Sequence, residues 1–505
     1  MIKITQALKR AAGLRGASPA LIYDDQRWSY RQLKERVARF ASLLVSCGVA
    51  RGDRVAMLSS NNDHYWCFYY GAIWSGAIMV PLNHRLSTSE LINIVGDCQP
   101  RVLIYDAASE IKARALLERY PTLRLMSCET EHDLRCQDAD DMEPLDDRSG
   151  SGDDVALIVY TGGTTGLPKG VMLTHTNVVS NALNTIPYLS LSEETTQLHV
   201  GPFFHMGAGQ RIFTVTQAAG THVILPAFNV PEIMRHIEAH QINSMVLVPT
   251  MMKRLLDDPD RARFDLSSLR YVSYGAAPMP EALLRRFMRE FPECLLSQSY
   301  GQTECSPVAT GLLHRDHLDT GPYGAKLGTV GRAVSTVEIR IGDERHALDA
   351  GEVGEVLVRG PNVMRGYWKN PEATATTLKG GWLHTGDVGY LDDHDFLVIV
   401  DRMKDMIISG GENVYSSEVE NIISQIPGVD GCAVIGIPSE RWGEEVHAIL
   451  RGQVIPIEEI IAFCRPHLAG YKIPRSYEWI EEPFPLTSTN KINKRRLKET
   501  RGGAR

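Results

Sequence analysis

A segment rich in glycine and threonine, TGGTTGLPKG at 161–170, directly follows the apolar run VALIVY at 155–160. Glycines let backbone N–H groups approach an anion closely, and threonine hydroxyls add further donors. Lys169 at the end of the segment supplies a point charge for a phosphate. The order differs from the GxxxxGK[ST] loop of other nucleotide-binding proteins, because Pro168 precedes the lysine and Gly170 follows it. The segment therefore predicts a phosphate-binding loop of another kind, entered from a β-strand.

Four further polar segments follow along the chain. They are SYGQTE (299–304), HTGD (384–387), DRMKDMIISGGENVYSSEVE (401–420) and PLTSTNKINKRRL (485–497). In the first of them, Glu304 offers a hard oxygen ligand of the kind that suits Mg²⁺ bound through phosphates. Each segment is a weak pattern alone, but their joint occurrence by chance is negligible.

These segments, in this order, resemble the motifs of the acyl-adenylate-forming superfamily, which includes acyl-CoA synthetases, adenylation domains of peptide synthetases and beetle luciferases. The resemblance covers nearly the whole chain. Gly162 stands where the family usually has serine, and Asn490 stands where it usually has glycine before the lysine. Asparagine tolerates left-handed backbone angles better than most residues, which is compatible with the same turn. The resemblance implies ATP, Mg²⁺ and CoA as cofactors or co-substrates.

The resemblance also implies roles for individual residues. Tyr300 would stack on adenine, Asp387 would bind the ribose hydroxyls, and Arg402 would hold ribose or phosphate. The residues expected to bind ATP or AMP are Thr161, Gly162, Gly163, Thr164, Thr165, Gly166, Lys169, Ser299, Tyr300, Asp387 and Arg402.

The attack of a carboxylate on the α-phosphate brings two anions together, so catalysis must come from positioning and charge neutralisation. By resemblance, Lys491 would bridge the carboxylate and the α-phosphate, Glu304 would hold the metal ion, and Thr303 would contact the α-phosphate. Lys494, in the same cationic run, is expected to be an ordinary surface lysine. The predicted catalytic residues are Lys491, Glu304, Thr303 and His205.

The family rotates a small C-terminal domain between two half-reactions, and the resemblance places its hinge at 401–404 with Lys404 as the pivot. The rotated domain would present Ser409, Gly410 and Gly411 to the acyl-adenylate. Glycines there would let the thin pantetheine arm of CoA run against the backbone. A plain turn between a strand at 406–408 and a helix from Ser416 is the alternative.

The acyl site is expected around 204–208, 248–250, 275–278 and 300–309, with His205 gating the carboxylate. Relatives that activate acetate carry tryptophan at the position of Gly301, so glycine implies room for an acid larger than propionate. The expected walls contain no charged side chain, which predicts an apolar fatty or aromatic acid without a second charge. The residues assigned to acyl binding are His205, Met206, Ala276, Ala277 and Gly301.

Apolar runs and helical patterns alternate along the chain and predict an α/β fold with largely parallel sheets. Strands are expected at 54–59, 101–105, 155–160, 197–201, 222–226, 244–248 and 271–275. A helix is expected at 29–48, where Ser29 and Gln32 can form a capping box and Gly48 ends the pattern. We predict a large N-terminal domain of layered α/β subdomains plus a β subdomain (1–400), the hinge, and a small mobile α+β domain (405–505).

The composition and net charge of the chain limit the kinds of partner that it is expected to bind. The net charge of −8 comes without a basic domain, so no nucleic-acid partner is expected. The longest apolar stretch, at 71–82, is too short to span a membrane, and no targeting segment is recognised. The nine cysteines form no CxxC pair and are expected to be free thiols in the cytoplasm.

The sequence thus predicts a cytoplasmic AMP-forming acid–thiol ligase of the fatty-acyl or aryl-CoA branch, with a small carboxylic acid, ATP and CoA as partners. A stand-alone ligase that loads a carrier protein, and an inactive adenylate-binding regulator, are the alternatives. Intact Lys169, Glu304, Asp387 and Lys491 argue against the regulator. Monomer and homodimer both stay open.

Overall fold

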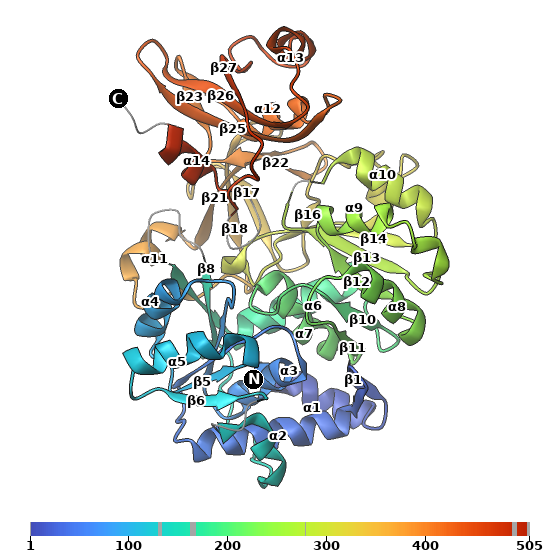
Figure 1. Cartoon of the computed structure of the whole chain (residues 1–505), viewed down its shortest axis with the longest axis vertical. Helices are drawn as coiled ribbons and strands as arrows, with labels where there is room; N and C mark the ends of the chain where they lie inside the picture. Colours follow the sequence, from blue (N-terminus) through green and yellow to red (C-terminus); the bar gives the residue numbers. More distant parts are fainter. Residues whose placement is uncertain (1, 130–133, 162–167, 278, 487–491, 502–505) are drawn as a thin grey trace. The chain divides into compact units, whose positions relative to one another are not determined.

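The computed structural model describes residues 2–129, 134–161, 168–277, 279–486 and 492–501 (Figure 1). The chain forms two compact units, the first made of Met1–Ile339 and Val358–Leu383, the second of Arg340–Leu357 and His384–Arg505. Both contain helices and sheets, which confirms the predicted α/β class. Residues 384–400, expected in the N-terminal domain, group with the second unit. The hinge at 401–404 stays a prediction.

The first unit contains a nine-stranded sheet with the order β16-β15-β14-β13-β12-β10-β11-β1-β2. Its six central strands, β14 to β1, run parallel, as the alternating pattern predicted. The strands are β1 (Pro19–Tyr23), β2 (Gln26–Ser29), β10 (Thr196–His199), β11 (Thr221–Ile224), β12 (Ser244–Leu247), β13 (Tyr271–Gly275), β14 (Leu295–Tyr300), β15 (Thr310–Leu312) and β16 (Arg332–Ala333).

An eight-stranded sheet in the same unit has the order β19-β9-β8-β4-β3-β5-β6-β7. It is parallel from β8 to β7, whereas β9 returns antiparallel beside β8 and carries the glycine-rich segment between them. The strands are β3 (Arg54–Leu58), β4 (Ile78–Leu82), β5 (Val102–Tyr105), β6 (Arg124–Ser127), β7 (Leu134–Arg135), β8 (Val155–Thr161), β9 (Lys169–Thr174) and β19 (Gly366–Tyr367).

Two five-stranded sheets complete the fold. One consists of β17 (Glu338–Ile341), β18 (Gly354–Arg359), β20 (Leu378–Lys379), β21 (Trp382–Leu391) and β22 (Leu397–Arg402). The other lies in the second unit and consists of β23 (Ile407–Ser409), β24 (Glu412–Val414), β25 (Val429–Ser439), β26 (Gly443–Gly452) and β27 (Ser476–Trp479).

The helix expected at 29–48 is present as α2. The capping box expected at Ser29 and Gln32 is present at the start of α2. The helices are α1 (Thr5–Leu14), α2 (Tyr30–Ser46), α3 (Asp63–Trp74), α4 (Thr88–Cys98), α5 (Glu110–Arg119), α6 (His175–Tyr188), α7 (Met206–Ala218), α8 (Val230–His240), α9 (Pro249–Asp257), α10 (Glu281–Glu290), α11 (Pro371–Thr377), α12 (Ser416–Ile423), α13 (Ile457–Cys464) and α14 (Lys494–Arg501).

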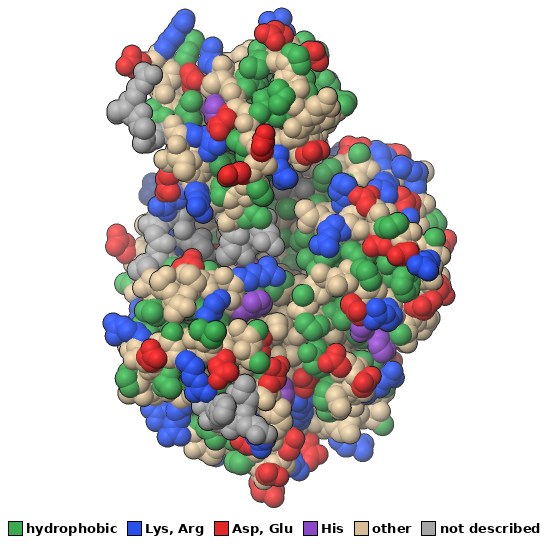
Figure 2. Space-filling view, viewed as in Figure 1, with side chains coloured by type: hydrophobic (Ala, Val, Ile, Leu, Met, Phe, Trp, Pro, Cys, Tyr) green, Lys and Arg blue, Asp and Glu red, His purple; other side chains and the backbone are tan. Residues whose placement is uncertain are grey.

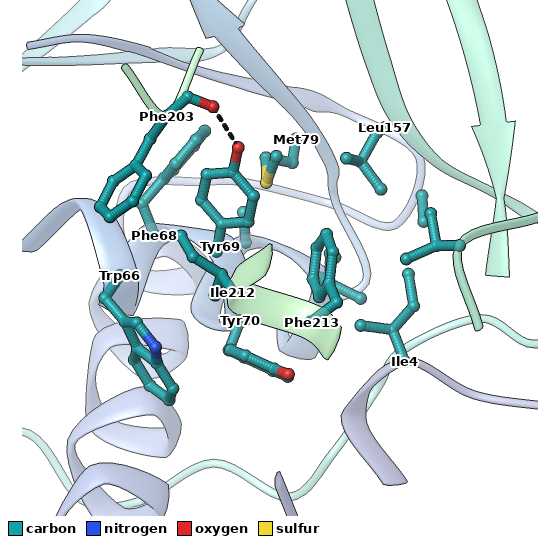
Figure 3. Packing of buried hydrophobic residues seen from close by; sticks show 14 of the residues in the cluster. Ile4, Trp66, Phe68, Tyr69, Tyr70, Met79, Leu157, Phe203, Ile212 and Phe213 are labelled. Carbon is teal, nitrogen blue, oxygen red and sulfur yellow. Dashed lines mark hydrogen bonds between the residues drawn. The ribbon is translucent and has the colours of Figure 1, made fainter. Parts of the chain in front are cut away.

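The main hydrophobic core surrounds α3, which is buried along nearly its whole length. Figure 3 shows aromatic side chains of α3 packed against Phe203, Ile212 and Phe213. The Tyr69 hydroxyl donates a hydrogen bond to the backbone oxygen of Phe203. Because Phe203 lies two residues before His205, this core fixes the segment that enters the predicted acyl site.

The surface charges are mixed on the visible face, and the cysteines are free. Figure 2 shows Lys and Arg side chains intermingled with Asp and Glu on the visible face. All nine cysteines are free thiols, and all but Cys432 are buried. No helix in the described ranges has the length and apolar character needed to cross a membrane.

Candidate active site

The glycine-rich segment joins two neighbouring antiparallel strands. Thr161 ends β8 and pairs with Lys169, the first residue of β9. The Thr161 hydroxyl donates to the Lys169 carbonyl at 3.4 Å. Residues 162–167 lie outside the described part of the chain, so the roles expected of the residues from Gly162 to Gly166 stay predictions. The structure does establish that Lys169 stands at the closing end of the loop, as the motif required.

Two side chains, Lys169 and Tyr367, connect the end of the loop to Glu304. The Nζ of Lys169 lies 5.0 Å from the centre of the Tyr367 ring. The Tyr367 hydroxyl in turn donates to Oε1 of Glu304 at 2.9 Å. Burial and the nearby Glu304 carboxylate raise the pKa of Tyr367, so the phenol keeps its proton and remains a donor. Sequence reasoning missed Tyr367, because only the pairing of β19 with β9 brings it to the site.

The segment that carries Glu304 is anchored by backbone and amide hydrogen bonds. The Glu304 carbonyl accepts from the backbone N–H of Met364 at 2.8 Å. Buried Asn362 donates to the carbonyls of Cys305 and Val308 at 2.9 and 3.0 Å, and Asn181 donates to the same two carbonyls. Four polar contacts on two carbonyls hold this turn rigidly and so fix the position of Glu304.

The three other residues predicted to act in this segment lie next to Glu304. Ser299 and Tyr300 end β14 and are half-buried, and Thr303 begins the short 3₁₀ turn that contains Glu304. The structure therefore brings Ser299, Tyr300, Thr303 and Glu304 together on one strand end. Their contacts with adenine and phosphate stay predictions.

Gly301 is required by the backbone. Its φ is +153°, and a Cβ there would lie 2.0 Å from the Pro307 carbonyl oxygen. A side chain would therefore strike the main chain of its own turn before reaching the space where an acyl group is expected. A larger residue at 301 would therefore have to displace the main chain of this turn, and the acyl-binding role expected of Gly301 stays a prediction.

The start of α7 places the other predicted acyl residues. His205 is the N-cap residue and its ring lies 4.4 Å from that of Phe204. Met206 is buried in the main core, whereas Gly207 is exposed and a Cβ there would meet no atom within 4 Å. Gly207 is thus the position of α7 that leaves open space next to His205.

Ala276 and Ala277 follow the end of β13. Ala276 is exposed and has a φ of +64°, and Ala277 is half-buried. Their small side chains leave the carboxyl end of β13 uncovered, which is where ligands commonly bind to parallel sheets. Their contact with an acyl group stays a prediction.

Arg211 is a charged residue that sequence reasoning missed. It lies on α7, is 7% exposed, and donates through Nη2 to the hydroxyl of Ser273 at 2.9 Å. Because Arg211 comes one helical turn after Gly207, helical spacing could have revealed it. Arg211 lies outside the residues expected to line the acyl site, and the expectation of an apolar lining stays a prediction.

The HTGD motif lies in the second unit, on β21. Asp387 is 5% exposed and faces Arg402 of β22 as a cross-strand pair, with 3.1 Å between Oδ1 and the arginine Nε. Glu355 supports the motif by accepting from the Gly386 N–H and by contacting His384 Nδ1 at 2.7 Å. A buried carboxylate beside a guanidinium offers an acceptor and donors at one place, which is what a ribose phosphate requires.

Gly410 and Gly411 form the two-residue turn of a β-hairpin between β23 and β24. Their φ angles are +64° and +87°, the left-handed conformations that such a turn demands. The two glycines therefore have a structural reason as well as the predicted CoA role, which stays a prediction. The hydroxyl-bearing Ser409 is buried at the strand end.

An aromatic and cationic cluster, also missed from sequence, adjoins this turn. The Trp442 carbonyl accepts from the Gly410 N–H at 2.8 Å. The guanidinium carbons of Arg441 and Arg475 lie 4.7 and 4.2 Å from the centre of the Trp442 ring. An indole with two arginines is able to bind an anion and a flat ring together.

The remaining predictions concern the C-terminal lysines and the hinge. Lys404 is exposed. Lys491 lies outside the described residues, so its catalytic role stays a prediction. Lys494 is not the surface lysine that was expected. Its Nζ lies 2.7 Å from Glu420 Oε1 and 2.7 Å from Ser416 Oγ, which ties α14 to α12.

Comparison with known proteins identifies the family to which this fold and these motifs belong. Residues 8–368 match the AMP-binding enzyme family, and residues 418–491 match the AMP-binding enzyme C-terminal domain. The chain therefore belongs to the AMP-binding, adenylate-forming enzymes.

Several of the relatives are acid–CoA ligases. The chain is 39% identical to a feruloyl-CoA synthase of Amycolatopsis sp, over 92% of both proteins. It is 36% identical to the long-chain-fatty-acid–CoA ligase FadD13 of Mycobacterium tuberculosis, over 94% of this chain and 93% of the relative. The o-succinylbenzoate CoA synthetase of Bacillus subtilis, solved with its acyl-adenylate, superposes with a TM-score of 0.86 at 30% identity over 99% of both chains. The chain is an AMP-forming acyl-CoA synthetase that uses a carboxylic acid, ATP and CoA.

Proposed function

We propose that this ligase first converts its acid and ATP into an acyl-adenylate and pyrophosphate, and then transfers the acyl group to the thiol of CoA. The contact of Tyr367 with Glu304, beside Lys169, supports the first step most directly. A cation for phosphate and a carboxylate for Mg²⁺ are the groups that neutralise the charge of ATP under attack by a carboxylate.

The metal role rests on the chemistry of the donors. Glu304 is buried and held by a phenol that stays protonated, so its carboxylate is oriented before any metal arrives. No group of three or more His, Cys, Asp or Glu side chains within the described ranges is arranged to hold a metal ion. One protein carboxylate together with phosphate oxygens is the usual way in which Mg²⁺ is bound. The ion would draw the triphosphate toward Glu304 and offset its charge.

The acid is proposed to be aromatic or fatty and larger than propionate. The named relatives act on feruloyl, long-chain fatty and o-succinylbenzoyl groups. In this chain, Gly207 leaves open space at the start of α7, and Ala276 leaves the end of β13 uncovered. An acid of that size would enter between these two elements with its carboxylate toward His205.

The second step is proposed to use the hairpin turn at Gly410 and Gly411. The pantetheine arm would pass along this turn, and the nearby Arg441, Trp442 and Arg475 would hold the nucleotide part of CoA. Two guanidinium groups suit its phosphates, and the indole offers a face to its adenine.

Separate assays of the two half-reactions test the proposal. In Lys491→Ala, pyrophosphate release from acid and ATP should fall at least about 1000-fold, whereas thioester formation from supplied acyl-adenylate should stay within about threefold. Arg496→Ala is the matched control, because it removes an exposed cation from the same run of residues. Loss of both half-reactions in a folded Lys491→Ala protein would contradict the division of roles, as would loss of neither.

A further inference from the structure

Arg211 is a buried cation whose charge is not matched by a carboxylate. Its side chain leaves α7 and makes one hydrogen bond, from Nη2 to the Ser273 hydroxyl. Among the residues that the structure describes, no Asp or Glu forms an ion pair with it. Burial lowers the pKa of Arg211 to about 10, with Tyr188 opposing the shift, so the guanidinium is still charged near neutral pH. Buried charges are normally paired, because an unpaired one is costly to desolvate.

The surroundings of Arg211 are polar on the side that faces the sheet. Val272 and Tyr274 of β13 point into the core under α8, α9 and α10, so Ser273 between them points to the opposite face, where α7 lies. On the next strand, Ser297 is also buried and lies beside the Tyr188 hydroxyl. Hydroxyl groups and the His199 ring thus lie near Arg211, and none of them carries a negative charge near neutral pH.

The position of Arg211 relates this polar space to the acyl site. Gly207, Ala208 and Arg211 share one face of α7, because they are separated by three and four residues. Gly207 at the start of that face meets open space. Ser273 lies two residues before Gly275, where β13 ends and the uncovered Ala276 follows. Both elements therefore lead from the entrance near His205 inward to Arg211.

We propose that Arg211 is a specificity-determining residue at the inner end of the acyl site, where it binds an oxygen acceptor carried by the acid opposite its activated carboxylate. This inference rests on the proposed function and names the substrate class more closely. An anionic oxygen, such as a second carboxylate, fits best, because it alone supplies the missing countercharge. A phenol or carbonyl oxygen can accept the same hydrogen bonds without neutralising the guanidinium.

The test uses matched acids in the pyrophosphate-release assay with the full-length enzyme. One set is 3-phenylpropanoate with its 4-hydroxy, 4-acetyl and 4-carboxy derivatives, and the other is octanoate with octanedioate. Wild type should prefer the oxygen-bearing member of at least one set by about 10- to 100-fold in kcat/KM, the range for hydrogen bonds to a charged group. The carboxylate should rank first, and the order among the derivatives separates anionic from neutral oxygens.

Variants then assign that preference to Arg211. Arg211→Met should erase the preference while the unsubstituted acid reacts as well as before or better, and Arg211→Lys should keep part of it for the carboxylate. Arg254→Met, which removes an exposed arginine of α9, should change nothing. The acid panel with wild type already tests the proposal where Arg211→Met does not fold.

Two results would overturn the proposed role of Arg211. One is equal activity of wild type on all members of both sets of acids. The other is a uniform loss of activity on all acids in a folded Arg211→Met protein. Pyrophosphate release from the unsubstituted acids upholds the ligase activity independently, so failure of the proposed role of Arg211 is distinct from failure of the proposed function.

Discussion

The ion pair between Lys494 and Glu420 allows a quantitative prediction about the second unit. Lys494 on α14 and Glu420 on α12 are only 15% and 20% exposed at their side chains, and their charged atoms are 2.7 Å apart. Lys494→Met keeps most of the aliphatic packing but leaves the Glu420 carboxylate buried without its cation. Removing one partner of a buried pair costs about 3–5 kcal/mol, and the residual exposure here favours the lower end, about 3 kcal/mol. Each 1.4 kcal/mol is tenfold, so local opening of α12 and α14 should become about 100-fold more frequent.

The free-energy cost of Lys494→Met should depend on pH through the protonation of Glu420. Burial already raises the pKa of Glu420, and Lys494 opposes that rise, so the pKa must rise further in Lys494→Met. A carboxyl group with a raised pKa in the folded state takes up its proton more readily there than in the unfolded chain. The penalty is therefore small at and below about pH 4, where Glu420 is protonated in both states, and it grows until the pH exceeds the folded pKa.

Hydrogen exchange of the full-length protein, read by mass spectrometry on peptides from 416–423 and 494–501, measures this opening. Lys498→Met, one turn further along α14, is the control and should exchange as wild type does. Adding Glu420→Gln to Lys494→Met should recover most of the protection, because glutamine is neutral and its oxygen can still accept from the Val434 N–H. The reasoning is refuted if the double variant exchanges as fast as the single one, since the cost would then come from lost packing.

Five further variants test the site. Gly207→Leu fills open space and should lower kcat/KM for aromatic or long-chain acids at least about tenfold while sparing acetate. Gly301→Ala should destabilise the fold by about 2 kcal/mol or more, which would be seen as a lower Tm. Glu304→Gln should reduce pyrophosphate release at least about 100-fold, and Tyr367→Phe about fivefold with a higher Mg²⁺ requirement. Arg475→Gln should raise KM for CoA about tenfold and leave pyrophosphate release unchanged.

Four of these variants have results that would contradict the reasoning. Unchanged acid preference in Gly207→Leu would place the acyl group elsewhere, and a wild-type Tm in Gly301→Ala would mean that the turn relaxes easily. An unaltered Mg²⁺ titration in Tyr367→Phe would show that the phenol does not orient Glu304. An unchanged KM for CoA in Arg475→Gln would remove the cluster around Trp442 from the second step.

Structural features that depend only on residues close together in the sequence were predictable. The capping box at Ser29 depends on a residue three positions away, and the pairing of Thr161 with Lys169 depends on a loop of a few residues. The strand pattern was equally local, because strands of a parallel sheet that are buried on both faces are visible as continuous runs of apolar residues. These patterns, with the motif resemblance, were enough to predict the α/β class and the type of enzyme.

The sequence by itself determined which residues can do the chemistry, because residue type and local spacing decide what a loop or strand end offers. Only the tertiary structure decided which of them meet. Tyr367 reaches Glu304 across 63 positions, Arg211 reaches Ser273 across 62, and Lys494 reaches Ser416 across 78. No local pattern records such pairs, since each side chain looks unremarkable until packing removes water from around it and makes its charge or hydrogen bond costly to leave unmatched.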